Sequence, residues 1–235
     1  MKHLSKKLLA ALLCALLLLS LLPTVTFAAE TQGTCGENLT WVYTTSNKAL
    51  RISGTGSMQN YEPYDAPWND FSSEINTLIL DEGVTTIGSN AFRSSDVSTV
   101  KLPSTLVAIG DQAFYFCSFL EAITFPDSLV SVGASAFEET ELEQVTIPAS
   151  LTQIGDAAFL TYVSLEKFIV SESNPAFTTD QYGVLYSKDM TKLVQYPNAL
   201  RSSHPIPDSV VELCAYAFSL AWDANITLPE SLEII

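Results

Sequence analysis

The chain has 235 residues, of which 47% are hydrophobic and 16% are charged, a composition that excludes an intrinsically disordered protein. It carries 26 acidic and 11 basic residues, which gives a formal charge of -15. Because such a surface repels nucleic-acid phosphates and anionic lipid headgroups, we expect no nucleic-acid partner and no peripheral membrane attachment.

Residues 1–28 have the three parts of a secretory signal peptide. Three lysines in the first seven residues precede an apolar stretch at residues 8–22 and a polar stretch that ends at Ala28. The apolar stretch is shorter than the roughly 20 residues that span a bilayer. We therefore predict cleavage after Ala28, a secreted or cell-surface location, and no membrane insertion after signal removal. The 8 basic and 26 acidic residues that remain give a formal charge of -18.

The following segment, residues 29–74, contains the pattern of a β-hairpin. Apolar residues alternate over residues 39–43 and again over residues 50–52, on either side of a polar turn at residues 45–48. A hairpin at this place can cover the apolar end of the structure that follows it. We therefore predict that residues 29–74 form an N-terminal cap.

Several aromatic residues stand near the end of this segment, among them Tyr61, Tyr64 and Trp68. Aromatic rings stack on the apolar faces of sugars, so these three residues are candidates for a glycan-binding platform. The same rings can instead pack inside the cap, where they bury a large apolar area. The sequence leaves both interpretations open.

From residue 75 onward the chain is built from a repeat. The pattern Ile-Gly-x-x-Ala-Phe and close variants of it recur with glycines at Gly88, Gly110, Gly133 and Gly155, in steps of 22 or 23 residues. An apolar residue followed by proline recurs with the same period, and apolar residues alternate before it. A unit of this length cannot bury its own apolar face. We therefore predict a solenoid in which short parallel strands stack along a concave face.

Each unit is expected to follow the same path. Proline ends the strand because it cannot donate a hydrogen bond to the sheet. The chain then returns along the convex side, where the repeat glycine allows a backbone angle or a close approach that a side chain would block. The Ala-Phe pair after the glycine is predicted to form a short helical turn, with phenylalanines such as Phe137 filling the space between the two sides.

The complete pattern, Leu-x-x-Ile-x-Leu-Pro-x-Ser-Leu-x-x-Ile-Gly-x-x-Ala-Phe-x-x-Cys, resembles the BspA-like class of leucine-rich repeats found in secreted and surface proteins. The resemblance covers about residues 75–235, and residues 34–68 are similar to the segment that often precedes such repeats. It implies a leucine-rich-repeat solenoid, α/β and rich in β structure, that recognises proteins. The family's cysteine position falls at Cys117, which indicates packing, whereas Tyr162 departs from the pattern and is expected to push its coil outward.

The period breaks once, at about residues 165–205. Apolar segments at residues 183–186 and 193–197 flank a polar turn at residues 188–191, which predicts a hairpin inside one longer, irregular repeat. The last five residues correspond to the middle of a repeat. We therefore expect the repeats of residues 75–235 to be truncated, either as a fragment of a longer product or by a shortened gene.

The strands of the solenoid should present one outward residue per coil in a regular row, with a second row of glutamates beside it. Carboxylates on adjacent strands lie about 5 Å apart and repel one another, so a row of them can attract a cationic partner surface or a divalent ion. The predicted partner-binding residues of the two rows are Lys101, Glu121, Thr124, Glu143, Thr146, Glu166, Ile169 and Thr227. A plain solvated acidic face is the other interpretation of the glutamates.

The sequence offers little for catalysis or metal binding. Beyond residue 28 the only histidine is His204, which excludes a site with two histidine ligands, and neither an EF-hand calcium loop nor a Gly-x-Ser-x-Gly pattern occurs. Cys35, Cys117 and Cys214 are too few and too irregular for a disulfide framework, and we interpret them as small buried residues. We expect no enzyme activity, no metal and no cofactor.

The sequence thus favours a secreted or cell-surface module that binds proteins through its concave face. The resemblance implies an extracellular protein partner, on a host or a neighbouring cell, and a role in adhesion. The alternative is a module that directs a larger exported enzyme to glycan or cell wall through Tyr61, Tyr64 and Trp68. A purely structural spacer is the third possibility.

Overall fold

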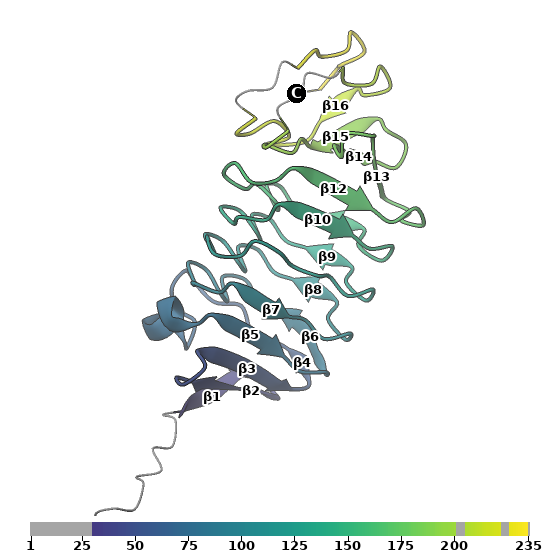
Figure 1. Ribbon diagram of the computed structural model, residues 1–235. Helices are drawn as coiled ribbons and strands as arrows, with labels where there is room; N and C mark the ends of the chain where they lie inside the picture. Colours follow the sequence, from purple (N-terminus) through teal and green to yellow (C-terminus); the bar gives the residue numbers. More distant parts are fainter. Residues whose placement is uncertain (1–29, 201–204, 222–225, 235) are drawn as a thin grey trace, which may run out of the picture.

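A computed structural model describes residues 30–200, 205–221 and 226–234 of the chain. They form a solenoid whose coils stack along one axis (Figure 1). The predicted signal peptide, residues 1–28, lies outside the described residues. Within the part of the chain that the structure describes, none of the helices has the length and apolar character that a membrane span requires.

The solenoid begins with three antiparallel strands, β1 (Glu30–Gly36), β2 (Leu39–Thr44) and β3 (Ala49–Gly54). The predicted hairpin is confirmed, since β2 pairs with β3 and Trp41 lies opposite Ile52. Strand β1, which pairs with the outer edge of β2, is not predicted because most of its residues are exposed and it lacks an apolar alternation. The other edge, β3, pairs in parallel with the first strand of the repeats.

One side of the solenoid carries the strands in which the sequence predicts apolar alternation. They are β5 (Thr77–Leu80), β7 (Thr99–Lys101), β10 (Gln144–Ile147) and β12 (Lys167–Val170). We call the outward surface of this side the strand face. Strand β5 pairs in parallel with β3 and β7, and β10 pairs in parallel with β12. Buried and exposed residues alternate along β10, as the sequence predicts.

The strand expected at residues 120–125 does not form, although Leu120 and Phe125 are buried as predicted. The coil from Gly110 to Gly133 has 23 residues, one more than the coil before it. We attribute the lost strand to this extra residue, which puts the backbone out of register with β7. The strand face is therefore divided between two separate sheets.

The opposite side of the solenoid is one parallel sheet. Its strands are β4 (Gly56–Ser57), β6 (Val84–Ile87), β8 (Ala108–Ile109), β9 (Ser131–Val132) and β11 (Gln153–Ile154). At its end the N–H groups of Gly110 and Gly133 each donate to the preceding coil, over 2.9 Å in both cases. A Cβ on Gly110 would lie 2.6 Å from the backbone nitrogen of Ser89. The glycine is thus needed for close approach of the coils rather than for a positive φ.

The Ala-Phe segment differs from its prediction, because it is a hydrogen-bonded turn and not a helical turn. Two residues after the glycine, φ is positive at non-glycine residues, for example +57° at Asn90 and +54° at Gln112. This conformation directs the N–H of Phe92 to the carbonyl oxygen of Ala113 in the next coil, at 2.8 Å. The same bond recurs one coil later. The coils of Gly110 and Gly133 are therefore each bonded to the next coil at the turn and to the previous coil at the glycine.

The phenylalanines of these turns form a continuous stack inside the solenoid. Ring centroids of Phe92, Phe114, Phe137 and Phe159 follow one another at 5.4, 5.2 and 5.5 Å, and the last two pairs are within 10° of parallel. All four side chains are buried, which confirms the predicted filling of the interior. Cys117 is buried beside this stack, and its thiol lies 3.0 Å from the carbonyl oxygen of Phe92.

The irregular repeat contains β13 (Phe177–Thr179), β14 (Leu185–Ser187) and β15 (Lys192–Gln195), followed by β16 (Glu212–Leu213). The predicted hairpin is confirmed by the antiparallel pairing of β14 with β15. Buried Asn174 joins this repeat to the preceding coil, since its amide donates to the carbonyl oxygens of Pro148 and Leu151.

Replacing Phe137 by alanine should lower the free energy of unfolding by about 3–5 kcal/mol, because the cavity would interrupt the ring stack between two neighbouring coils. Phe119 is the matched control, since its ring is exposed and its replacement by alanine should change stability by less than about 0.5 kcal/mol. Urea denaturation monitored by circular dichroism measures both values. Equal, small effects of the two substitutions would contradict the ring stack as a source of stability.

Candidate recognition surfaces

The predicted row of outward residues is exposed but not continuous. Thr146 and Ile169 lie opposite each other on β10 and β12, and together they line a shallow hollow of about 450 Å³. Lys101 lies on β7, in the other sheet of the strand face. Thr124 lies in the segment that forms no strand, and Thr227 forms an isolated bridge with Pro205 beyond the irregular repeat. The row is thus broken into separate pieces.

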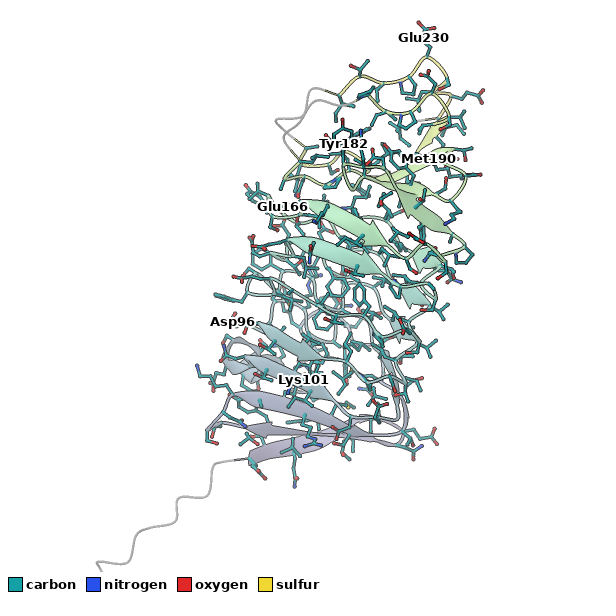
Figure 2. All side chains as sticks on the ribbon, turned by 45° about the vertical axis from the view of Figure 1, so that its right-hand side comes forward. Asp96, Lys101, Glu166, Tyr182, Met190 and Glu230 are labelled. Carbon is teal, nitrogen blue, oxygen red and sulfur yellow. The ribbon has the colours of Figure 1, made fainter. Side chains whose placement is uncertain are left out.

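The three glutamates of the second row do lie on successive coils. The N–H of Glu143 donates to the carbonyl oxygen of Glu121 at 3.3 Å, and that of Glu166 donates to Glu143 at 2.8 Å. All three side chains are exposed, and within the described residues none of them forms an ion pair. Figure 2 shows Glu166 at the same edge of the molecule as Asp96, whereas Lys101 lies nearer the middle of the strand face. The binding role of both rows remains a prediction.

The predicted aromatic platform does not form, because two of its three rings are inside the protein. Trp68 is buried, stacks on Phe92 at 5.2 Å and donates its indole N–H to the carbonyl oxygen of Ala91 at 2.7 Å. Tyr61 is also buried and meets Trp68 edge to face. The two rings close the first end of the phenylalanine stack. Only Tyr64, which is 55% exposed, could contact a ligand.

A different group of exposed aromatic residues lies where each coil turns back toward the strand face. We call this surface the corner edge, and it comprises Tyr64, residues 93–96, residues 115–119 and residues 138–141. Phe116 and Phe119 are 51% and 56% exposed. Sequence reasoning missed these rings because it assigned only the apolar residues that fit the repeat. The available signal was the group of four aromatic residues within 114–119, where the two neighbouring repeats have mainly polar residues.

An arginine and two tyrosines lie together at this edge. The guanidinium carbon of Arg93 lies 4.1 Å from the ring centroid of Tyr115 and 5.4 Å from that of Tyr64, and Nη1 donates to Gln112 at 2.8 Å. The Arg93 contact also lowers the pKa of the Tyr64 hydroxyl. The arginine and the two tyrosines, with Asp96 and Phe116, line a hollow of about 460 Å³.

The next coil adds acidic side chains to the corner edge. The N–H of Phe116 donates to the carbonyl oxygen of Glu138 at 2.8 Å, and that of Glu141 donates to Leu120 at 3.1 Å. Partial burial raises the pKa of the Glu139 carboxyl, and the neighbouring charges of Glu138 and Glu141 raise it further. The corner edge therefore combines exposed rings with a group of carboxylates.

The side of the solenoid that was predicted to be convex holds a wider hollow than the strand face. An open groove of about 1010 Å³ runs over β4, β6, β8, β9 and β11, lined mainly by small or polar residues such as Thr86 and Ser131. Two carboxylates, Asp111 and Asp156, lie along it. One oxygen of Asp111 accepts the N–H of Ala134 at 2.8 Å, so this carboxylate helps to join two coils.

Two buried cysteines of the described residues have raised thiol pKa values. Burial raises the pKa of the Cys35 and Cys117 thiols to about 12, which is opposite to the shift that activates a nucleophilic cysteine. Among the residues that the structure describes, no three histidine, cysteine or acidic side chains cluster in a way that could hold a metal ion. His204 lies outside those residues.

Comparison with known proteins places the repeats in a recognised family. Residues 70–184 match, in six copies, the family model described as BspA type leucine rich repeat region. A leucine-rich repeat protein from Eubacterium ventriosum superposes with a TM-score of 0.71 at 27% identity, over 88% of this chain and 62% of that one. The pneumococcal vaccine antigen PcpA superposes with a TM-score of 0.63 at 24% identity, over 87% and 66%.

The chain thus spans less than two thirds of the length of either solved structure. A leucine-rich repeat protein from Bacteroides ovatus shares the fold more distantly, with a TM-score of 0.51 at 22% identity over 84% of this chain and 53% of that one. No curated protein matches the chain in sequence. The recognition of the repeats from their pattern is confirmed.

Neutralising Glu139 by substitution with glutamine should make the protein more stable at neutral pH. A carboxyl whose pKa is raised on folding contributes stability only at low pH and loses it as the pH rises through that pKa. The variant should therefore equal the unaltered protein in acid and exceed it by up to about 0.5 kcal/mol at pH 7. Urea denaturation at several pH values measures the difference. Glu37→Gln, at an exposed position in the cap, is the control, and a Glu139→Gln variant destabilised at pH 7 would contradict the repulsion.

Proposed function

We propose that this chain, whose residues 70–184 are leucine-rich repeats of the BspA type, is an exported module that recognises proteins. The repeat fold is that of a protein-interaction module. The proposal also includes an extracellular location, a partner on a host or neighbouring cell, and a role in adhesion. The signal-peptide pattern of residues 1–28 and the acidic composition support the location and the absence of nucleic-acid partners.

The observation that carries the proposal is the regular stacking of exposed glutamates. Glu121, Glu143 and Glu166 follow one another on successive coils, joined by backbone hydrogen bonds, and within the described residues they have no ion-pair partner. Like charges held in a row raise the free energy of the isolated protein. A partner with a complementary basic surface relieves that repulsion and gains orientation from the spacing of the coils.

The size of the strand face also favours a macromolecular ligand. A stable protein interface buries about 800 Å² on each partner. The hollow on the predicted outward row, at Thr146 and Ile169, is shallow and open. An open face with exposed side chains on successive coils suits a protein surface better than a small molecule, which needs an enclosed pocket.

The glycan-targeting alternative loses its support from the aromatic cap. Tyr61 and Trp68 are buried in the interior, and Trp68 is the first ring of the phenylalanine stack. Exposing either ring to a sugar would open the end of the core. We therefore propose protein recognition as the function, and we do not propose a glycan-binding site in the cap.

The proposal predicts saturable binding of the purified protein to at least one member of a panel of purified secreted and matrix proteins. Replacing Glu121, Glu143 and Glu166 by lysine should weaken that binding at least about tenfold, because it reverses the charge of the row. The control replaces Glu30, Glu37 and Asp208 by lysine, which changes the net charge equally at exposed positions away from the row. Biolayer interferometry measures both.

Equal losses in the two triple variants would mean that only net charge matters, and would contradict recognition by the strand face. Unchanged binding of the first variant would likewise remove the glutamate row from the interface. Circular dichroism of each variant verifies that the fold is retained.

A further inference from the structure

The repeat fold does not account for the exposed aromatic rings of the corner edge. Phe116 has a φ of +58°, and the corresponding residues of the neighbouring coils, Ser94 and Glu139, have φ values of +55° and +59°. A serine and a glutamate therefore make the same turn. A bulky residue in this left-handed region is uncommon, and half of the Phe116 side chain faces solvent. The turn at residue 116 therefore requires a positive φ, but it does not require a phenylalanine side chain.

The extra residue of the 23-residue coil lies in the same corner. It falls between buried Cys117 and buried Leu120, where the chain presents Ser118 and Phe119 to solvent. An inserted residue that only lengthened a loop would ordinarily be polar. Here the insertion exposes a second phenylalanine in the same corner as Phe116.

The two phenylalanines join the tyrosines and the arginine already described. The rings of Tyr115 and Phe116 are 6.4 Å apart between centroids, and Tyr115 is covered on one side by the guanidinium of Arg93. Exposed rings that lie beside an arginine are the residue types most enriched at the centres of protein interfaces. Arg93 is held by the tyrosine contacts and by Gln112, so the cluster is ordered before any partner arrives.

The charges beside the rings define the chemistry of the partner. Glu138, Glu139 and Glu141 lie on the coil next to Phe116 and Leu120, and Asp96 lines the hollow between the rings. Repulsion among the three glutamates is one cause of the raised pKa of Glu139. A partner that brings positive charge to this edge removes the repulsion, whereas a second copy of the chain would bring more negative charge.

We infer that the corner edge is a docking site for a basic segment of another protein, in which lysine or arginine alternates with apolar residues. The apolar residues and the aliphatic parts of the basic side chains would cover Phe116, Phe119 and the outer face of Tyr115. The basic headgroups would pair with the glutamates and with Asp96. The glutamate row adjoins this surface, since Glu121 lies two residues after Phe119 and Glu143 two residues after Glu141. The inference rests on the exposed rings and the corner glutamates, so it does not depend on a binding role of that row.

A defined peptide tests the inference with the full protein. The probe is a fluorescein-labelled dodecapeptide of repeated Arg-Leu-Ser, and its control has glutamate in place of arginine. Fluorescence anisotropy should show saturable binding of the first peptide only, and the affinity should fall as the salt concentration rises. Absence of binding by the basic peptide, or equal binding of both peptides, would overturn the inference.

Two variants separate the rings from the charges. Phe116→Ser with Phe119→Ser, and separately Glu138→Gln with Glu139→Gln and Glu141→Gln, should each weaken binding at least about tenfold. The charge control is Glu30→Gln with Glu37→Gln and Asp208→Asn, which should change the affinity less than about twofold. The variant with lysine at Glu121, Glu143 and Glu166 keeps the rings and the corner glutamates. Loss of protein binding in that variant therefore tests the proposed function, whereas the two variants above test the corner edge.

Serine already occupies the position of Phe116 in the preceding coil, so the double serine variant should fold, and Phe119→Ser alone provides a second, milder test. If the charge control lost as much affinity for the basic peptide as the corner-glutamate variant, net charge alone would explain the binding, and the docking site would be overturned. Two other results would also overturn the inference. One is binding of a neutral oligosaccharide that the serine variant abolishes, and the other is self-association, measured by analytical ultracentrifugation, that the serine variant abolishes.

Discussion

The structure depends on one constraint, namely that no coil of 22 or 23 residues can bury its own apolar face. Each coil therefore covers the next, and the contact is most direct in the aromatic stack from Trp68 through Phe159. Backbone bonds at the glycines run to the preceding coil, and those at the Ala-Phe turns run to the following coil. Because the coils of Gly110 and Gly133 have both sets, the loss of either coil weakens two neighbours.

The same constraint explains where the surface is free to vary. Residues such as Phe137 and Gly110 are needed by their neighbours, whereas an outward residue such as Phe119 can change without opening the core. Coils of different length share the core and differ at the corner, where the added residue exposes Phe119. The irregular coil length thus leaves the ring stack intact but breaks the strand face and enlarges the corner edge. Variation of coil length is a simple way for a repeat protein to build a specific surface on a uniform core.

Much of the architecture could be predicted from the sequence because the repeat shows which residues are equivalent. The burial of Phe137 and the hairpin of β2 and β3 followed directly from that pattern and from apolar alternation. The turn at Asn90 could not be predicted in the same way, because its positive φ is imposed by hydrogen bonds to the next coil and not by a glycine. For Trp68 the sequence left both glycan binding and packing inside the cap open. The structure decides for packing, because the Trp68 ring stacks on Phe92 and closes the end of the phenylalanine stack. The corner rings were overlooked because they stand outside the repeated positions.

The most direct test of this account is native-state hydrogen exchange resolved to single amides. The amides of Phe114, Phe137 and Gly133 bond between coils, so they should exchange only when coils separate and should share a high protection free energy. The amides of residues 122–125, where the expected strand is lost, should exchange faster than those of β10. If Phe114 and Phe137 exchanged as quickly as the exposed turn at residues 45–48, stacking of the coils would not be what holds the protein together.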